Sequence, residues 1–105
     1  MPVEGLFRKT VCIDIDGTIC EEGAYPYYQL AKLLPGAHEK IWTFRTKGYT
    51  IILYTARHPE DRKETEDWLL VNNIPYDLLI LGKPKADVYI DDRAIKFTGW
   101  EAIDL

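Results

Sequence analysis

Short apolar runs alternate with polar segments along this chain, and the alternation predicts strands and helices in turn. The run that begins at Thr10 is rich in β-branched residues and stops at a pair of aspartates, so it predicts a buried strand. Residues 49–54 form a second run, apolar enough to predict a strand buried on both faces, as parallel strands are. Two further strands are predicted at 76–81 and 87–90.

Two segments between these strands have helical spacing. Ala37, Ile41 and Phe44 recur at i, i+4 and i+7 and define one apolar face, and Gly48 is expected to end that helix. The second helix is expected over 59–73, because acidic residues fill its first turn and a proline suits its first position. Its expected buried face consists of Trp68, Leu69 and Val71.

This order of elements predicts the fold class. Strands that alternate with helices imply a parallel sheet with right-handed crossovers and helices on both faces. We therefore expect an α/β protein with a Rossmann-like, doubly wound parallel sheet. At 105 residues the chain is expected to form a single domain over 1–105.

Polar side chains follow each predicted strand. They are Asp14 and Asp16 after the first, Thr55 after the second, Lys83 after the third, and Asp91 and Asp92 after the fourth. Because the carboxyl ends of parallel strands meet at one edge of a sheet, these groups are expected to converge there. Crowded carboxylates take up a proton or a cation, and a hard cation with oxygen ligands is Mg²⁺. Phosphoryl transfer uses this set of groups, and an aspartate can be its nucleophile.

The stretch Asp14-Ile15-Asp16-Gly17-Thr18 resembles the first motif of the haloacid dehalogenase (HAD) superfamily of phosphohydrolases. The other motifs of that family follow in the expected order, so the resemblance spans about residues 10–93. Larger members insert a cap domain after the first motif. Only about twenty residues separate the first motif from Pro35-Gly36 here, so the chain resembles a capless member.

The resemblance implies a role for each of these residues. Asp14 would attack phosphorus and bind Mg²⁺. Asp16 would protonate the leaving oxygen and then activate water, with its backbone carbonyl on the metal. Thr55 and Lys83 would contact the phosphoryl group, Lys85 being the alternative lysine. Asp91 and Asp92 would hold the metal directly or through water, and the sequence does not choose between them.

The expected substrate-binding residues lie beside these positions. They are Gly17, Thr18, Ala56, Arg57 and Arg93. The two arginines are candidates for holding an anionic leaving group, because guanidinium pairs well with phosphate and carboxylate, and surface ion pairing is the alternative for both.

Charge and composition limit the classes of binding partner that we expect for this chain. The net charge of −4 argues against binding to long nucleic acid, and no apolar stretch approaches the length of a membrane span. The first five residues lack the pattern of a secretion signal, so a cytoplasmic location is expected. Tyr25, Tyr27 and Tyr28 are candidates for a subunit contact, and a homo-oligomer would cover an open, capless site.

The predicted function is a Mg²⁺-dependent phosphatase that hydrolyses a phosphate monoester through an aspartyl-phosphate intermediate. A small phosphorylated metabolite, either a sugar phosphate or a nucleotide, is the expected substrate. The alternatives are a phosphatase acting on polynucleotide ends and a non-catalytic phospho-acceptor or interaction domain, since a fold does not fix a function.

Overall fold

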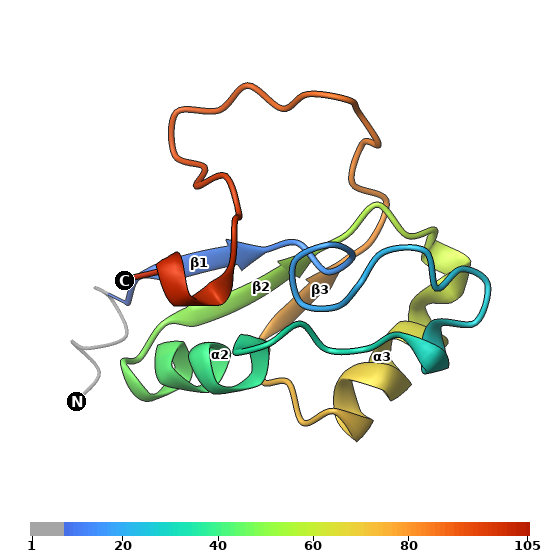
Figure 1. Ribbon diagram of the computed structural model, residues 1–105, viewed down its shortest axis with the longest axis horizontal. Coiled ribbons are helices and arrows are strands. Elements are labelled where there is room, and N and C mark those ends of the chain that lie inside the picture. The colour runs from blue at the N-terminus through green and yellow to red at the C-terminus, as the bar shows by residue number, and fades with distance from the viewer. Residues whose placement is uncertain (1–7) are drawn as a thin grey trace.

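A computed structural model describes residues 8–105 of the chain. Its centre is a parallel sheet with the order β1-β2-β3 (Figure 1). The strands are β1 (Thr10–Ile13), β2 (Thr50–Tyr54) and β3 (Leu78–Ile80). The register pairs Ile13 with Leu53 and Leu53 with Leu79, so one apolar row crosses all three strands. The first three predicted strands are therefore present, with the third shorter than expected.

In the described residues, α-helices and short 3₁₀ helices (labelled η) connect the strands, and one more 3₁₀ helix follows β3. They are η1 (Tyr28–Leu30), α2 (Ala37–Thr46), η2 (Pro59–Asp61), α3 (Arg62–Val71) and η3 (Trp100–Ala102). The apolar face predicted for α2 is buried. The α/β class, the Rossmann-like parallel sheet and the absence of a cap are confirmed within the described part of the chain.

Both α2 and α3 cover the same face of the sheet (Figure 1), which differs from the expectation of helices on both faces. Two consecutive right-handed crossovers that advance in one direction place both helices on one side. The burial of β2 follows from this arrangement. Ile51 and Leu53 are fully buried, while the residues that alternate with them, Thr50, Ile52 and Tyr54, are only partly buried. The prediction that β2 is buried on both faces is wrong.

One residue of the run predicted to form a buried strand, and one of the expected buried face of the second helix, are exposed. Cys12 lies on β1 between residues that face the helices, so its side chain points to the uncovered face of the sheet. Val71 is 82% exposed, because the buried stripe of α3 runs through Thr65, Trp68 and Leu69 and misses it.

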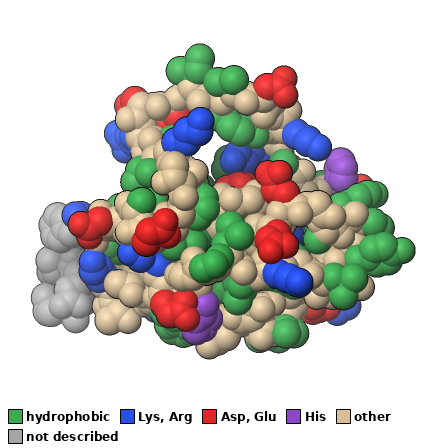
Figure 2. Space-filling model, in the orientation of Figure 1, with side chains coloured by type: hydrophobic (Ala, Val, Ile, Leu, Met, Phe, Trp, Pro, Cys, Tyr) green, Lys and Arg blue, Asp and Glu red, His purple; other side chains and the backbone are tan. Residues whose placement is uncertain are grey.

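The predicted fourth strand is absent from the described residues. Residues 82–98, here called the 82–98 loop, contain no strand and arch away from the body of the molecule (Figure 1). Local hydrogen bonds stabilise the bend: the Tyr89 hydroxyl donates to the Pro84 carbonyl, and the Arg93 amide donates to Asp91. Such local bonds compete with strand pairing. Figure 2 shows apolar side chains exposed along this arch, and Ile90 is 98% exposed.

No helix in residues 8–105 is long and apolar enough to span a membrane. The five N-terminal residues, on which the expectation of no secretion signal rests, lie outside the described residues.

Candidate active site

The turn after β1 carries the two aspartates of the motif. The Ile15 carbonyl accepts hydrogen bonds from the amides of Thr18, Ile19 and Cys20, while the Gly17 amide donates to the Cys20 carbonyl. Gly17 has φ = +87°, a value that favours glycine and allows so tight a turn. These four amides are therefore satisfied inside the turn. Their bonds stiffen the turn that positions Asp14 and Asp16.

Asp14 lies directly after the last residue of β1 and meets a lysine from the far side of the sheet. The Lys83 ammonium is 3.7 Å from one carboxylate oxygen of Asp14, and the Thr18 hydroxyl donates to the other at 3.4 Å. Burial raises the pKa of Asp14 above its ordinary value, while the nearby charge of Lys83 opposes that rise. The Asp14 side chain is 33% exposed, so a substrate can reach it.

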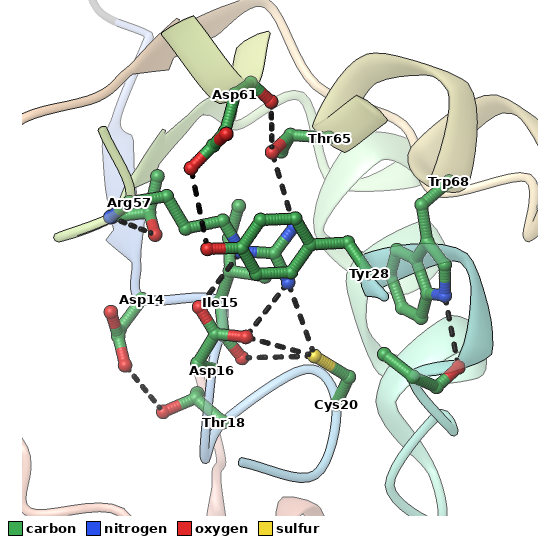
Figure 3. A network of polar contacts seen from close by, with 12 residues as sticks. Asp14, Ile15, Asp16, Thr18, Cys20, Tyr28, Arg57, Asp61, Thr65 and Trp68 are labelled. Carbon is green, nitrogen blue, oxygen red and sulfur yellow. Dashed lines mark hydrogen bonds and ion pairs between the residues drawn. The ribbon is translucent and has the colours of Figure 1, made fainter. Parts of the chain in front are cut away.

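Asp16 is held by an arginine from the end of β2 (Figure 3). Arg57 donates from Nε to one carboxylate oxygen at 2.8 Å and from Nη2 to the other at 2.7 Å. This two-point geometry is the strong form of an arginine–carboxylate pair. The buried Cys20 thiol lies 3.6 Å from Asp16, and its burial raises the pKa of the thiol to about 12. Cys20 is therefore a neutral thiol that packs beside the pair.

Arg57 is enclosed on its remaining sides. Its guanidinium lies 3.8 Å from the centroid of the Tyr28 ring, and its Nη1 donates to the Thr65 hydroxyl at 3.1 Å (Figure 3). Burial alone would lower the pKa of Arg57, but the hydrogen bonds and charge of Asp16 raise it above its ordinary value. The side chain of Arg57 is 1% exposed. The structure thus pairs Arg57 with Asp16 and does not leave it open to a leaving group.

Thr55 connects the ends of β2 and β3. Its carbonyl accepts a hydrogen bond from the Lys83 amide at 2.9 Å, and its hydroxyl accepts one from the Arg57 amide at 3.2 Å. Thr55 is buried and Ala56 partly buried. One short segment therefore fixes the backbone of both Lys83 and Arg57. Lys85, the alternative lysine, is exposed on the 82–98 loop.

The residues expected to follow a fourth strand do not lie at this edge of the sheet. Asp91, Asp92 and Arg93 are exposed on the 82–98 loop. Over residues 8–105 no three His, Cys, Asp or Glu side chains are grouped so that they could hold a metal ion. The donors assembled near Asp14 do not fit a magnesium site in this arrangement, because one carboxylate there faces a lysine and the other an arginine.

Tyr28 and Thr65 belong to the polar network around Asp16, and sequence reasoning did not find these roles. Tyr28 was grouped with two exposed tyrosines, but it is buried. The sequence Thr55-Ala56-Arg57 gave a partial indication that Arg57 lies beside Thr55 at the site, because alternate residues of an extended segment point the same way. Nothing local marked Thr65 as a partner of Arg57.

Comparison with known proteins gives a family match. The family model described as PITM 1-3, LNS2 domain, matches residues 11–98. No curated protein matches the chain.

Solved structures share the fold. A Vibrio cholerae protein aligns with a TM-score of 0.77 at 24% identity, over 92% of this chain and 90% of that one. A conserved protein from Bacteroides thetaiotaomicron aligns with a TM-score of 0.63 at 25% identity, over 90% and 84%. A chain of the Pnkp1/Rnl/Hen1 complex aligns with a TM-score of 0.61 at 26% identity, over 81% of this chain but 30% of that one.

The match spans well over half of the chain, and it agrees with the parallel sheet and with the motif turn that follows β1. The chain therefore belongs to the family of the PITM 1-3 LNS2 domain and has the fold of a HAD-like hydrolase.

Proposed function

We propose that this chain is a phosphatase that transfers the phosphoryl group of a monoester to Asp14 and then to water. The observation that carries the proposal is the pairing of Asp14 with Lys83 directly after β1, two residues before a second aspartate. Family and fold support phosphatase-type chemistry in general. The transfer through Asp14 and the class of substrate are our proposals.

In the first step a carboxylate oxygen of Asp14 forms a bond to phosphorus as the bond to the leaving oxygen breaks. Asp16 enters this step with a proton taken up from solvent through its 30% exposed side chain, and it passes that proton to the leaving oxygen, so that an alcohol departs. In the second step Asp16 takes a proton from water, the water oxygen attacks phosphorus, and inorganic phosphate leaves Asp14 as a free carboxylate. The two steps return both aspartates to their starting states.

The residues around Asp14 have supporting roles in this proposal. The Lys83 ammonium offsets the negative charge of the nucleophile and of the incoming phosphoryl group, which would otherwise repel each other. Thr55 accepts hydrogen bonds from the amides of Lys83 and Arg57, and this segment with Ala56 would border the phosphoryl oxygens. Thr18 donates to Asp14 and so fixes the direction of its attack.

The dependence on Mg²⁺ is a separate proposal. It requires the middle of the 82–98 loop, beyond Lys83, to approach Asp14, so that Asp91 or Asp92 can add carboxylate oxygens to a shared ion. The apolar side chains exposed on that loop, and the outer edge of β1, which has no strand partner in the described residues, are compatible with such an approach. Arg93 would arrive with the same loop and could contact an anionic leaving group.

The substrate class that we favour is a small phosphorylated metabolite, such as a sugar phosphate or a nucleotide, acted on in the cytoplasm. A polynucleotide end is the second candidate, because one similar structure is a chain of an RNA repair complex. The net charge of −4 weighs against the second candidate. An oligomer that covers the site would use the exposed Tyr25 and Tyr27, and a monomeric mass at all concentrations would contradict it.

One experiment tests these proposals together. Phosphate release is measured from an aryl phosphate, a panel of sugar phosphates and nucleotides, and an oligonucleotide with a 3′-phosphate, each with Mg²⁺ and with a chelator. Release that needs Mg²⁺ and is fastest for a small metabolite is the expected result. Full activity in chelator contradicts the metal proposal. Binding without any turnover identifies the chain as an interaction domain and contradicts the enzyme proposal.

A further inference from the structure

The two side chains of the Arg57–Asp16 ion pair differ strongly in their exposure to solvent. The Arg57 side chain is 1% exposed, whereas the Asp16 side chain is 30% exposed. We propose that Arg57 is a positioning residue, which aims the Asp16 carboxylate at the leaving oxygen and does not itself contact substrate. This inference rests on the proposed function, because it gives Arg57 its role through Asp16.

The geometry of the pair fixes the direction of the carboxylate. Arg57 contacts both oxygens of Asp16, so the plane of the carboxylate is set by the plane of the guanidinium. The Asp16 side chain stays 30% exposed although both of its oxygens accept from Arg57. A substrate can therefore reach Asp16 from the solvent side, while the same approach to Arg57 is closed. An acid that sits on a turn needs such a constraint, since a misplacement of ~1 Å costs about a hundredfold in rate.

The guanidinium is itself held by two groups besides Asp16, and the backbone of Arg57 is fixed as well. Tyr28 covers one face of the guanidinium at 3.8 Å, and the Thr65 hydroxyl accepts from Nη1. The backbone amide of Arg57 donates to the Thr55 hydroxyl. The Thr65 hydroxyl also donates to the Asp61 carbonyl at 2.9 Å, so the anchor extends into α3. A group meant to bind variable substrates would be left free to move. Arg57 has instead the surroundings of a fixed support.

A positioning residue and a substrate-binding residue predict different kinetics. If Arg57 bound the leaving group, its removal would raise KM, most for anionic substrates, whatever stands at position 16. If Arg57 acts through Asp16, its removal lowers the rate of bond breaking and leaves KM nearly unchanged. The loss then grows as the leaving group becomes poorer, because a poor leaving group depends more on the proton of Asp16.

The test compares wild type, Arg57→Met, Asp16→Asn and the double variant in single-turnover reactions. The two substrates are an aryl phosphate with a good leaving group and an alkyl phosphate with a poor one. Arg57→Met should slow the alkyl phosphate by about a hundredfold and the aryl phosphate far less, with KM within about twofold of wild type. In the Asp16→Asn background the same change should cost nothing further, within about twofold.

Arg45→Met is the matched control, because Arg45 donates to both oxygens of Asp77 in an ion pair at the opposite edge of the sheet. It should leave both rates unchanged. If Arg57→Met does not fold, Tyr28→Leu removes the cover of the guanidinium and should show the same dependence on leaving group. A raised KM for Arg57→Met, or an equal loss in the Asp16→Asn background, overturns the positioning role. Absence of turnover in wild type overturns the proposed function itself.

Discussion

Replacing Trp100 by phenylalanine should destabilise the fold and loosen the turn that carries both aspartates. The Trp100 indole nitrogen donates to the Thr18 carbonyl at 2.7 Å, and its side chain is 3% exposed. This bond joins the C-terminal η3 to the motif turn. Phenylalanine keeps one ring against Phe44 and Phe97 but has no donor for the carbonyl.

The expected cost follows from two losses. A partly buried carbonyl without its donor costs about 1–3 kcal/mol, and the smaller ring adds a packing loss of about 1 kcal/mol. The free energy of unfolding should therefore fall by about 2–4 kcal/mol, which for a domain of this size lowers the urea midpoint by about 1–2 M. Turnover should fall as well, because Thr18 orients Asp14.

Trp42→Phe is the matched control for this prediction. The Trp42 indole donates to the Asn73 carbonyl at 2.8 Å, but this side chain is 37% exposed. Water can replace the lost donor there, so the cost should stay near 0.5 kcal/mol. Unfolding is followed by far-UV circular dichroism, which reports mainly on the backbone and so allows the two variants to be compared with wild type. Equal losses in the two variants would refute the claim that Trp100 anchors the motif turn.

Three further predictions concern charged groups. Burial raises the pKa of Asp14 in the folded chain, so the contribution of Asp14 to stability falls as pH rises above the ordinary pKa of 3.8. Asp14→Asn should therefore raise the melting temperature at pH 7 but not at pH 3. A lower melting temperature at pH 7 would contradict this. The Ile51 amide lowers the pKa of Asp77, so the stability that Asp77 adds should be present above pH 3.8 and lost below it. Melts of Asp77→Asn that differ from wild type equally at pH 3 and pH 7 would disprove it. Lys83→Met should lower kcat by about a hundredfold while Lys85→Met stays within about twofold of wild type, and the reverse order would move the role to Lys85.

The sequence predicted most of the elements that position the site. β1 ends where the apolar run meets Asp14, and the apolar face of α2 is the one read from Ala37, Ile41 and Phe44. These features depend on local pattern, which a single sequence carries. The meeting of Asp14 with Lys83 followed from the parallel topology, because parallel strands bring their carboxyl ends to one edge.

The differences have physical causes that no local pattern contains. Residues 87–90 have the composition of a strand, but Tyr89 bonds to Pro84 and the loop bends away before it reaches β1. Arg57 looked like an anion-binding residue, but Tyr28 covers it from a segment far away in the sequence. The ion pair of Arg57 with Asp16 depends on which side chains meet in three dimensions. Neither outcome could be read from spacing along the chain.

The central claim is that Asp14 becomes covalently phosphorylated, and a trapped intermediate tests it most directly. The Asp16→Asn chain is mixed with an aryl phosphate, quenched in acid and examined by mass spectrometry of its peptides. A burst of released phenol followed by a stall, with one phosphoryl group on Asp14, is the predicted result, because the leaving group needs little protonation while hydrolysis lacks its base. Asp14→Asn should fold and show neither burst nor label. Normal turnover by correctly folded Asp14→Asn, or a phosphoryl group on another residue, would contradict the account.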